Sequence, residues 1–279
     1  MEEHPFIVTL RAPDAAGIIA ELARAVAQAG GNISDVGQHS EQGTFACRLE
    51  VDPTINPASL QMQLSLLSEE HGWAIEVFEG SEVPKIVIAC SKTLHCLSDL
   101  LARIAIGEMV CDIAAIVSDQ PDGKELADRF NTPFIHIPVG QDRMEQEAQL
   151  AATLLDLNPD LVVLARYMRI LPASMTQDWE EKMINIHHSF LPAFAGAGPY
   201  KRAHERGVKL IGATAHYVTA GLDEGPIIHQ EITPVTHRDS STDLARRGAD
   251  VERNVLATAV RLHLEHRVMV FGNRTCVFN

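Results

Sequence analysis

Hydrophobic and polar positions over the first 80 residues repeat with two different periods, one typical of strands and one typical of helices. Short runs rich in β-branched and aromatic residues predict four strands, and two segments with apolar residues three or four positions apart predict helices. In chain order, these are a strand at 6–10, a helix at 18–29, strands at 33–36 and 45–51, a helix at 57–71 and a strand at 73–78. The βαββαβ order predicts a ferredoxin-like domain over residues 1–80.

From residue 85 onward the predicted strands are apolar throughout, which is typical of strands that are buried on both faces of a sheet. Such runs lie at 86–90, 113–117, 134–137 and 161–165, with helical patterns at 94–104, 123–130 and 143–157; strands at 210–218 and 227–232, a helix at 240–265 and a hairpin at 268–278 follow. This alternation predicts an α/β domain over residues 85–279, with a mostly parallel sheet covered by helices on both faces. The polar stretch 81–84, which ends in proline, predicts the linker between the two domains.

Charge and cysteine content restrict the classes of partner and compartment. The 279 residues carry a formal net charge of −14, which argues against nucleic acid or an anionic membrane surface, because such contacts need clustered Lys and Arg. Five widely spread cysteines without a Cys-x-x-Cys motif predict reduced thiols. The start of the chain has no signal-peptide pattern, and no apolar run is long enough to span a bilayer. We therefore expect a cytoplasmic protein.

Asn185-Ile186-His187 places an amide and an imidazole on the same side of an extended chain, because side chains two residues apart point the same way. An amide can donate a hydrogen bond to a developing oxyanion, an imidazole can move protons, and a carboxylate can orient the imidazole. Asp223, in a loop rich in Gly and Pro, is the candidate carboxylate. These three groups suit the transfer of a small acyl group. The alternative to a catalytic role is that Asn185 and His187 are polar residues of a turn at the end of a strand, and that Asp223 is only a turn residue.

Three segments resemble those of the folate-dependent formyltransferase family, namely 164–171, 184–192 and 212–228. Residues 187–194, 207–214 and 272–275 are similar to a branch of it, the formyltetrahydrofolate deformylases, in which an ACT domain precedes a formyltransferase-like domain. The resemblance covers nearly the whole chain. It implies hydrolysis of 10-formyltetrahydrofolate to tetrahydrofolate and formate, which supplies formate for purine synthesis and balances the one-carbon pool. It places catalysis on Asn185, His187 and Asp223, with no cofactor and no metal.

The resemblance also implies a folate pocket in which apolar side chains sandwich the pterin and backbone groups read its edge. Its residues would be Leu164, Arg169, Ile170, Leu171, Ser189, Val218 and Leu222. The alternative is that most of the apolar members are ordinary core. Arg166 and Arg169 are candidates to meet the acidic glutamate tail of the folate.

Two positions depart from the formyltransferase pattern. Glycinamide ribonucleotide formyltransferases hold a phosphate on a glycine-rich loop after the first strand, whereas residues 91–97 here contain no glycine. The missing phosphate cradle favours water as the formyl acceptor over the first alternative, transfer to an amine. The second alternative is a catalytically silent sensor of folate or amino acids. The other departure is Ala195, where relatives often carry Lys, which bears on rate or tail binding.

The first turns of the N-terminal domain, 14–19 and 30–33, resemble those of ACT domains. The resemblance implies amino-acid effectors, methionine and glycine, at a site that usually spans a dimer interface. Asp14 would accept the ligand amine and Asn32 would orient it, with Gly17 and Ile33 at the same site. The alternative is that Asp14 caps the following helix and that Asn32 ends it. Pairing of such domains predicts a homo-oligomer, either a dimer or a tetramer.

Overall fold

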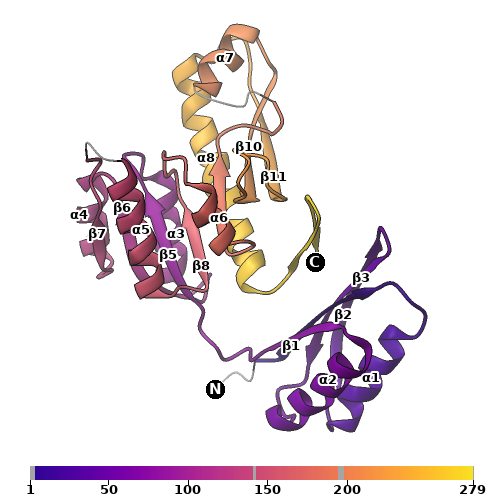
Figure 1. The fold of residues 1–279 in the computed structure, drawn as a ribbon. Coiled ribbons are helices and arrows are strands. Elements are labelled where there is room, and N and C mark those ends of the chain that lie inside the picture. The colour runs from indigo at the N-terminus through magenta and orange to yellow at the C-terminus, as the bar shows by residue number, and fades with distance from the viewer. Residues whose placement is uncertain (1–3, 141–142, 194–197, 279) are drawn as a thin grey trace. The chain divides into compact units, whose positions relative to one another are not determined.

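The computed structural model describes residues 4–140, 143–193 and 198–278 (Figure 1). The chain divides into two compact units by its internal contacts. The first unit extends to Glu82 and also includes Glu265–Phe271 and the segment from Thr275 onward. The second unit comprises Val83–Leu264 and Gly272–Arg274. The division expected from the sequence placed residues 265–279 in the second domain, so the two divisions differ in this segment.

The first unit has the predicted βαββαβ order, which is thereby confirmed. Its elements are β1 (Phe6–Pro13), α1 (Ile18–Gln28), β2 (Ile33–Glu41), β3 (Thr44–Val51), α2 (Pro57–His71) and β4 (Ala74–Phe78). The sheet is antiparallel, in the order β2-β3-β1-β4. Strand β2 continues five residues beyond the prediction because Gln42 and Gly43, both with positive φ, close a hairpin that pairs Glu41 with Thr44. Its side chains are largely exposed, so the hydrophobic pattern does not mark its end.

Both faces of this antiparallel sheet are covered by apolar side chains. On one face, Leu10 of β1 packs with Leu22 of α1 and Leu60 of α2 in a fully buried cluster. On the other face, Ala46 of β3 packs with Met269 and Phe278. The latter two belong to the terminal hairpin, β12 (Val268–Phe271) and β13 (Arg274–Val277). The terminal hairpin is therefore part of the core of the first unit.

The second unit is an α/β domain built on a seven-stranded sheet in the order β11-β10-β9-β8-β5-β6-β7. Its strands are β5 (Lys85–Cys90), β6 (Asp112–Ser118), β7 (Phe134–His136), β8 (Leu161–Leu164), β9 (Met183–His187), β10 (Leu210–Tyr217) and β11 (Ile227–Pro234). Strands β7, β6, β5, β8 and β9 run parallel, whereas β10 is antiparallel to both of its neighbours. The predicted mostly parallel sheet is confirmed.

Helices cover both faces of this sheet, as predicted. They are α3 (His95–Ala105), the 3-10 turn η1 (Pro121–Gly123), α4 (Lys124–Arg129), α5 (Arg143–Leu157), α6 (Ala173–Asp178), α7 (Pro199–Arg206) and α8 (Ser241–Leu264). On one face, Val87 and Val162 pack with Leu154 of α5 and Met175 of α6. On the other face, α3 packs against α8 (Figure 1). None of the helices in the described ranges has the length and apolar character that a membrane span requires.

The strand order places a topological switch point between β5 and β8. The chain proceeds from β5 outward to β6 and β7, and then returns to form β8 on the other side of β5. Ligands of such sheets bind where the carboxyl ends of the two strands diverge. Here the loops that follow β5 and β8 are joined by a hydrogen bond of 3.0 Å from the Met168 backbone N–H to Ser91 Oγ.

Candidate active site

Asn185 and His187 lie on the carboxyl half of β9 and face the same side of the sheet. Met183, at the start of that strand, packs in the cluster formed with α5 and α6. Because alternate side chains of a strand share a face, Asn185 and His187 also face the α5–α6 side. His187 is 5% exposed. The strand thus holds both groups rigidly at the edge where α/β sheets bind their ligands.

Asp223 reaches the same place from the loop between β10 and β11. Its carboxylate Oδ2 lies 3.1 Å from His187 Nδ1, and its side chain is 15% exposed. The loop is held by a backbone hydrogen bond of 2.9 Å from Tyr217 N–H to the Pro226 carbonyl, and Asp223 adopts a positive φ of 59°. Gly225 is required beside it, because a Cβ there would collide with the Tyr217 carbonyl. The structure therefore brings together the three residues that the sequence singled out.

His216 completes this group, although no role was predicted for it from the sequence. It lies directly opposite Asn185 on the neighbouring strand β10, and its Nε2 is 3.2 Å from Asn185 Nδ2. Its Nδ1 lies 2.8 Å from the Tyr217 carbonyl, to which it can donate, and its Nε2 also lies 3.7 Å from Asp223 Oδ1. His216 thereby orients Asn185 and leaves the second amide hydrogen to donate to a ligand.

The electrostatics of the group favour an ionised Asp223. The hydrogen bond with His187 and, after it, the one with His216 hold the pKa of Asp223 well below its ordinary value, against the opposing effect of burial. With Nδ1 of His187 turned to this carboxylate, the other ring nitrogen, Nε2, is buried and makes no hydrogen bond within the described residues. An imidazole that is oriented by a carboxylate and has one nitrogen uncommitted can exchange a proton with a ligand.

Six of the seven predicted folate residues come from the end of β8 and from the loops that follow β8 and β10, the second of which carries Asp223. Leu164 is opposite Asn185 on β8, and Leu171 and Val218 pack against the cluster that contains Leu164. Ile170 and Leu222 are 59% and 61% exposed, although they are large and apolar.

The two arginines proposed for the glutamate tail are both engaged by carboxylates. Arg169 donates from Nε to Oδ2 of the buried Asp119 at 2.6 Å, while its side chain remains 41% exposed. Arg166 faces Glu252 at 3.4 Å. Arg169 thus lies beside the folate residues, whereas Arg166 points toward α8. Ala195, the other position connected with tail binding, lies outside the described residues.

Ser189, the seventh predicted folate residue, lines a separate cavity of about 240 Å³. Its hydroxyl oxygen is buried and has no hydrogen-bond partner among the described residues. The cavity is mainly apolar and is formed with side chains of α7, β10 and β11, including Tyr200, Ile211 and Ile232. None of the other six predicted folate residues lines this cavity.

The four predicted effector residues of the first unit fall into two groups at opposite ends of its sheet. Asp14 follows the end of β1 and lies beside Gly43, just before the start of β3. Asn32 and Ile33 lie beside Val51 and Asp52, at the other end of β3. Eight residues of strand separate the two groups, roughly 25 Å. Gly17 precedes α1 with φ 98°, and this helix start has no side-chain cap, so Asp14 does not cap it.

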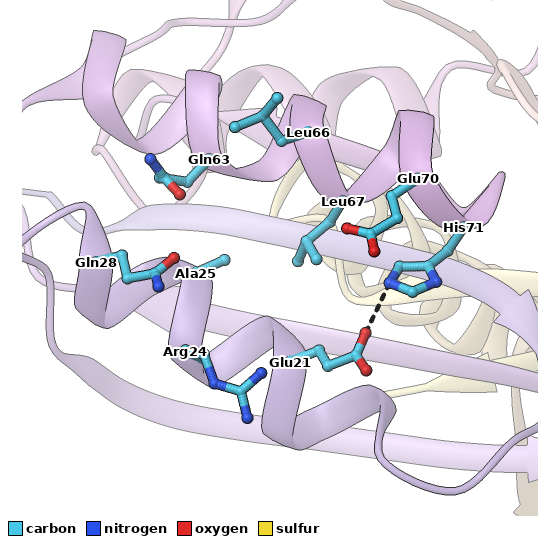
Figure 2. A pocket seen from close by; sticks show the side chains of 9 residues that line it. All are labelled: Glu21, Arg24, Ala25, Gln28, Gln63, Leu66, Leu67, Glu70 and His71. Atoms are coloured by element: carbon cyan, nitrogen blue, oxygen red, sulfur yellow. Dashed lines mark ion pairs between the residues drawn. The ribbon is translucent and has the colours of Figure 1, made fainter.

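A hollow of about 320 Å³ in the first unit lies elsewhere, between α1 and α2 (Figure 2). It is lined by Glu21, Arg24, Ala25, Gln28, Gln63, Leu66, Leu67, Glu70 and His71. Glu21 and His71 form an ion pair across it at 2.8 Å. None of the four predicted effector residues lines this groove.

One group among the described residues has the donor types and spacing of a metal site, namely His95, Cys96 and Glu252, whose ligand atoms lie within 4.8 Å of one another. Two features oppose a cation there. Burial raises the pKa of the Cys96 thiol well above its ordinary value, and the Arg166 guanidinium already lies 3.4 Å from the Glu252 carboxylate. The group therefore fits an ion pair within the protein better than a metal.

Comparison with known proteins agrees with the two-domain architecture. The family model for formyl transferases matches residues 84–260, and that for ACT domains matches residues 4–78. The chain is 46% identical over 272 residues to the formyltetrahydrofolate deformylase of Synechocystis sp., covering 95% of each protein. It is 43% identical to that of Bacillus subtilis, covering 96% of this chain and 91% of the relative.

Solved structures of a formyltetrahydrofolate deformylase and of a glycinamide ribonucleotide transformylase have folds similar to that of this chain. A formyltetrahydrofolate deformylase from Pseudomonas syringae is 38% identical and superimposes with a TM-score of 0.97, covering 100% of this chain and 96% of that one. Glycinamide ribonucleotide transformylase 1 from Symbiobacterium toebii is 34% identical with a TM-score of 0.68, covering 73% of this chain and 98% of its own. The chain therefore belongs to the formyltetrahydrofolate deformylase family, hydrolases that carry an ACT domain in front of a formyltransferase domain.

Proposed function

We propose that this chain hydrolyses 10-formyltetrahydrofolate to tetrahydrofolate and formate, with water as the formyl acceptor. The observation that carries the proposal is the convergence of Asn185, His187 and Asp223 at one edge of the sheet, with His187 Nδ1 3.1 Å from Asp223. The deformylase relatives at 46% and 43% identity support the same reaction. Leu164, Arg169, Ile170, Leu171, Val218 and Leu222 form the folate pocket, together with Ser189 from the loop after β9.

Each of the three side chains has a distinct role in the proposed reaction. Water attacks the formyl carbon, and the negative charge that develops on the formyl oxygen is stabilised by hydrogen bonds from the Asn185 amide and the His187 imidazolium. Asp223 stabilises the imidazolium and orders the attacking water. The bond between the formyl carbon and the folate nitrogen then breaks, and His187 passes a proton to that nitrogen. His187 regains a proton from the attacking water, and the second proton of that water is released when formate ionises. The products are formate and tetrahydrofolate, and no redox change occurs.

Replacement of Asp223 by Asn should lower turnover about 100-fold, in the range typical of lost acid–base assistance. The depressed pKa of Asp223 keeps its carboxylate ionised at all working pH values, so a full negative charge faces His187. Without that charge the imidazolium that forms during the reaction loses its stabilising partner, so the shape of the pH–rate profile should change as well. Steady-state rates from pH 5 to pH 9 measure this. An unchanged profile would show that Asp223 does not act on His187.

The reaction itself is tested by incubating the purified protein with 10-formyltetrahydrofolate in plain buffer, following absorbance and quantifying formate, with and without EDTA. We expect one formate per tetrahydrofolate, without any amine acceptor and without an effect of the chelator. If formyl loss required an amine, the protein would be a formyltransferase. If the folded protein bound folate without releasing formate under either condition, it would be a sensor.

The proposed reaction, the cysteines and the net charge also bear on the metabolic role, the location and the partners of the protein. Release of formate would supply purine synthesis and balance the pool of one-carbon units. All five cysteines are unpaired, which fits a reducing compartment and supports a cytoplasmic location. A net charge of −14 fits a small-molecule substrate better than nucleic acid or an anionic membrane as partner.

The ACT domain would bind methionine or glycine as effector, between two copies of the chain. Asp14 with Gly17 and Asn32 with Ile33 lie at opposite ends of one sheet, so a ligand touches both groups only if each comes from a different chain. This arrangement requires a homo-oligomer, a dimer or a tetramer. Asp14→Ala should weaken the response of turnover to added methionine or glycine at least about tenfold, the typical loss for a charged hydrogen bond, while basal turnover stays unchanged. Titration of activity with each amino acid measures it, and an unaltered response would remove Asp14 from the site.

A further inference from the structure

A second cluster of buried polar side chains lies in the catalytic unit, centred on Glu252 of α8, which is 1% exposed. Its Oε2 lies 2.8 Å from His95 Nε2 and 3.4 Å from Arg166 Nε, and its Oε1 accepts a hydrogen bond of 2.5 Å from the Tyr200 hydroxyl. These four residues, here named the Glu252 cluster, come from the start of α3, the loop after β8, α7 and α8. The cluster therefore fastens four separate segments to one point.

The Glu252 cluster is a set of compensated charges. Burial raises the pKa of Glu252, but the His95 hydrogen bond, the Arg166 charge and the Tyr200 hydrogen bond outweigh it and hold that pKa below its ordinary value. Removing one partner from such a buried carboxylate is costly, so the four side chains hold one another in place. Gly248, one turn before Glu252 on α8, leaves space for the Tyr200 side chain. A Cβ at this position would collide with the Tyr200 ring and hydroxyl.

The cluster lies next to the catalytic residues, on the other face of the sheet. His188 follows His187 in the chain, and its ring centroid is 5.1 Å from that of His187 and 6.2 Å from that of Tyr200. Burial, and after it the positive charge of Arg166, lower the pKa of His188 to about 4, so this ring is neutral at physiological pH. A single neutral side chain thus separates the cluster from the catalytic imidazole.

The catalytic residues and the Glu252 cluster lie on opposite faces of the sheet, so the two sides of the reaction site differ in their side chains. Leu164, Leu171 and Val218, which belong to the proposed folate pocket, lie on the α5–α6 side. The α3–α8 side carries His95 and Glu252 on its two helices, with Arg166 from the loop at the switch point. An acceptor must reach the formyl carbon from a direction that the departing folate does not occupy. A second substrate would enter the crevice from the α3–α8 side, whereas a water molecule needs almost no room there.

We propose that the Glu252 cluster determines acceptor specificity, by filling the α3–α8 side of the crevice and so reserving the formyl group for water. This inference rests on the proposed hydrolytic function. If the cluster is opened, a primary amine can take the place of water. Its nitrogen then bonds to the formyl carbon as the bond to the folate nitrogen breaks, and the proton that the amine loses passes to that nitrogen. The products are a formamide and tetrahydrofolate.

The test compares wild type with two variants of the cluster in the presence of 10-formyltetrahydrofolate and glycinamide, a small primary amine. Tyr200→Ala removes the ring that closes the cluster, and Glu252→Gln keeps its shape but removes the charge. The matched control is Val260→Ala, which also removes a buried side chain, on the same helix but two turns away, roughly 12 Å. Formate and N-formylglycinamide are quantified in the same sample, and thermal melting checks that each variant is folded.

We expect the ratio of N-formylglycinamide to formate to rise at least tenfold in Tyr200→Ala and several-fold in Glu252→Gln, and to stay at the wild-type value in Val260→Ala. An unchanged ratio in folded variants overturns the proposal. So does loss of hydrolysis in both variants without any formyl transfer, because the cluster would then serve hydrolysis itself. If Tyr200→Ala does not fold, the ratio for Glu252→Gln decides. Absence of formate from the wild type would instead overturn the proposed function, so the two failures are distinguishable.

Discussion

Replacement of His187 by alanine is expected to lower turnover at least about 1,000-fold, while folate binding stays within a few-fold of wild type. The imidazole supplies both a hydrogen bond to the developing oxyanion and the proton for the leaving nitrogen, and each of these contributions is typically worth 100-fold or more. Its Nδ1 is bound to Asp223, and its Nε2 is the nitrogen left for the ligand. Rates of formate release and folate affinity by fluorescence titration are the two measurements.

His229 provides the matched control for this substitution. It is also a histidine in an ion pair, 3.2 Å from Glu231, but it lies on β11 and its side chain is 30% exposed. His229→Ala should keep turnover within about twofold, since exposed ion pairs contribute little to stability. If His187→Ala retained wild-type turnover, proton transfer would have to come from another group. Equal losses in the two variants would indicate a general effect on folding.

Replacement of Asn185 by alanine is expected to lower kcat by about 100- to 1,000-fold with little change in KM. Loss of one oxyanion donor typically costs that much, because the hydrogen bond strengthens as charge develops in the transition state. His216 holds the amide from the neighbouring strand at 3.2 Å, so the donor is already in place before the substrate binds. Steady-state kinetics with 10-formyltetrahydrofolate separate the two constants.

The control for Asn185 is Asn254, an exposed asparagine of α8 whose side chain accepts a hydrogen bond of 3.3 Å from Arg103. Asn254→Ala should leave both constants within twofold, because the loss of an exposed polar contact usually has little effect. A rise in KM with unchanged kcat in Asn185→Ala would contradict the oxyanion role. It would assign Asn185 to ground-state binding of the folate instead.

Features with a strong local pattern were predictable from the sequence. The apolar runs that become β5, β6 and β8 are buried on both faces, and each was predicted within one or two residues of its observed bounds. The relation of Asn185 to His187 also follows from local geometry, since both lie on one strand. Helices α6 and α7, of six and eight residues, were not predicted.

Features that depend on contacts between distant segments were not predictable. His216 gains its role only because β10 pairs with β9 in the register that places it opposite Asn185. Glu252 is separated from His95 by 157 positions in the chain, and in the sequence it is one charged residue among many on a long helix. The separation of Asp14 from Asn32 likewise follows from strand register and not from the motifs that contain them.

The terminal hairpin has a consequence for the modularity of the ACT domain. Met269 and Phe278 cover one face of its sheet, and burial of such side chains contributes roughly 1.5–3 kcal/mol each. A protein cut at residue 80 would therefore lose part of the core of its first domain, although the ACT family match ends at residue 78. The ACT domain is continuous as a sequence motif but discontinuous as a folding unit. Transplanting it into another enzyme would require the last 15 residues of the chain to be moved with it.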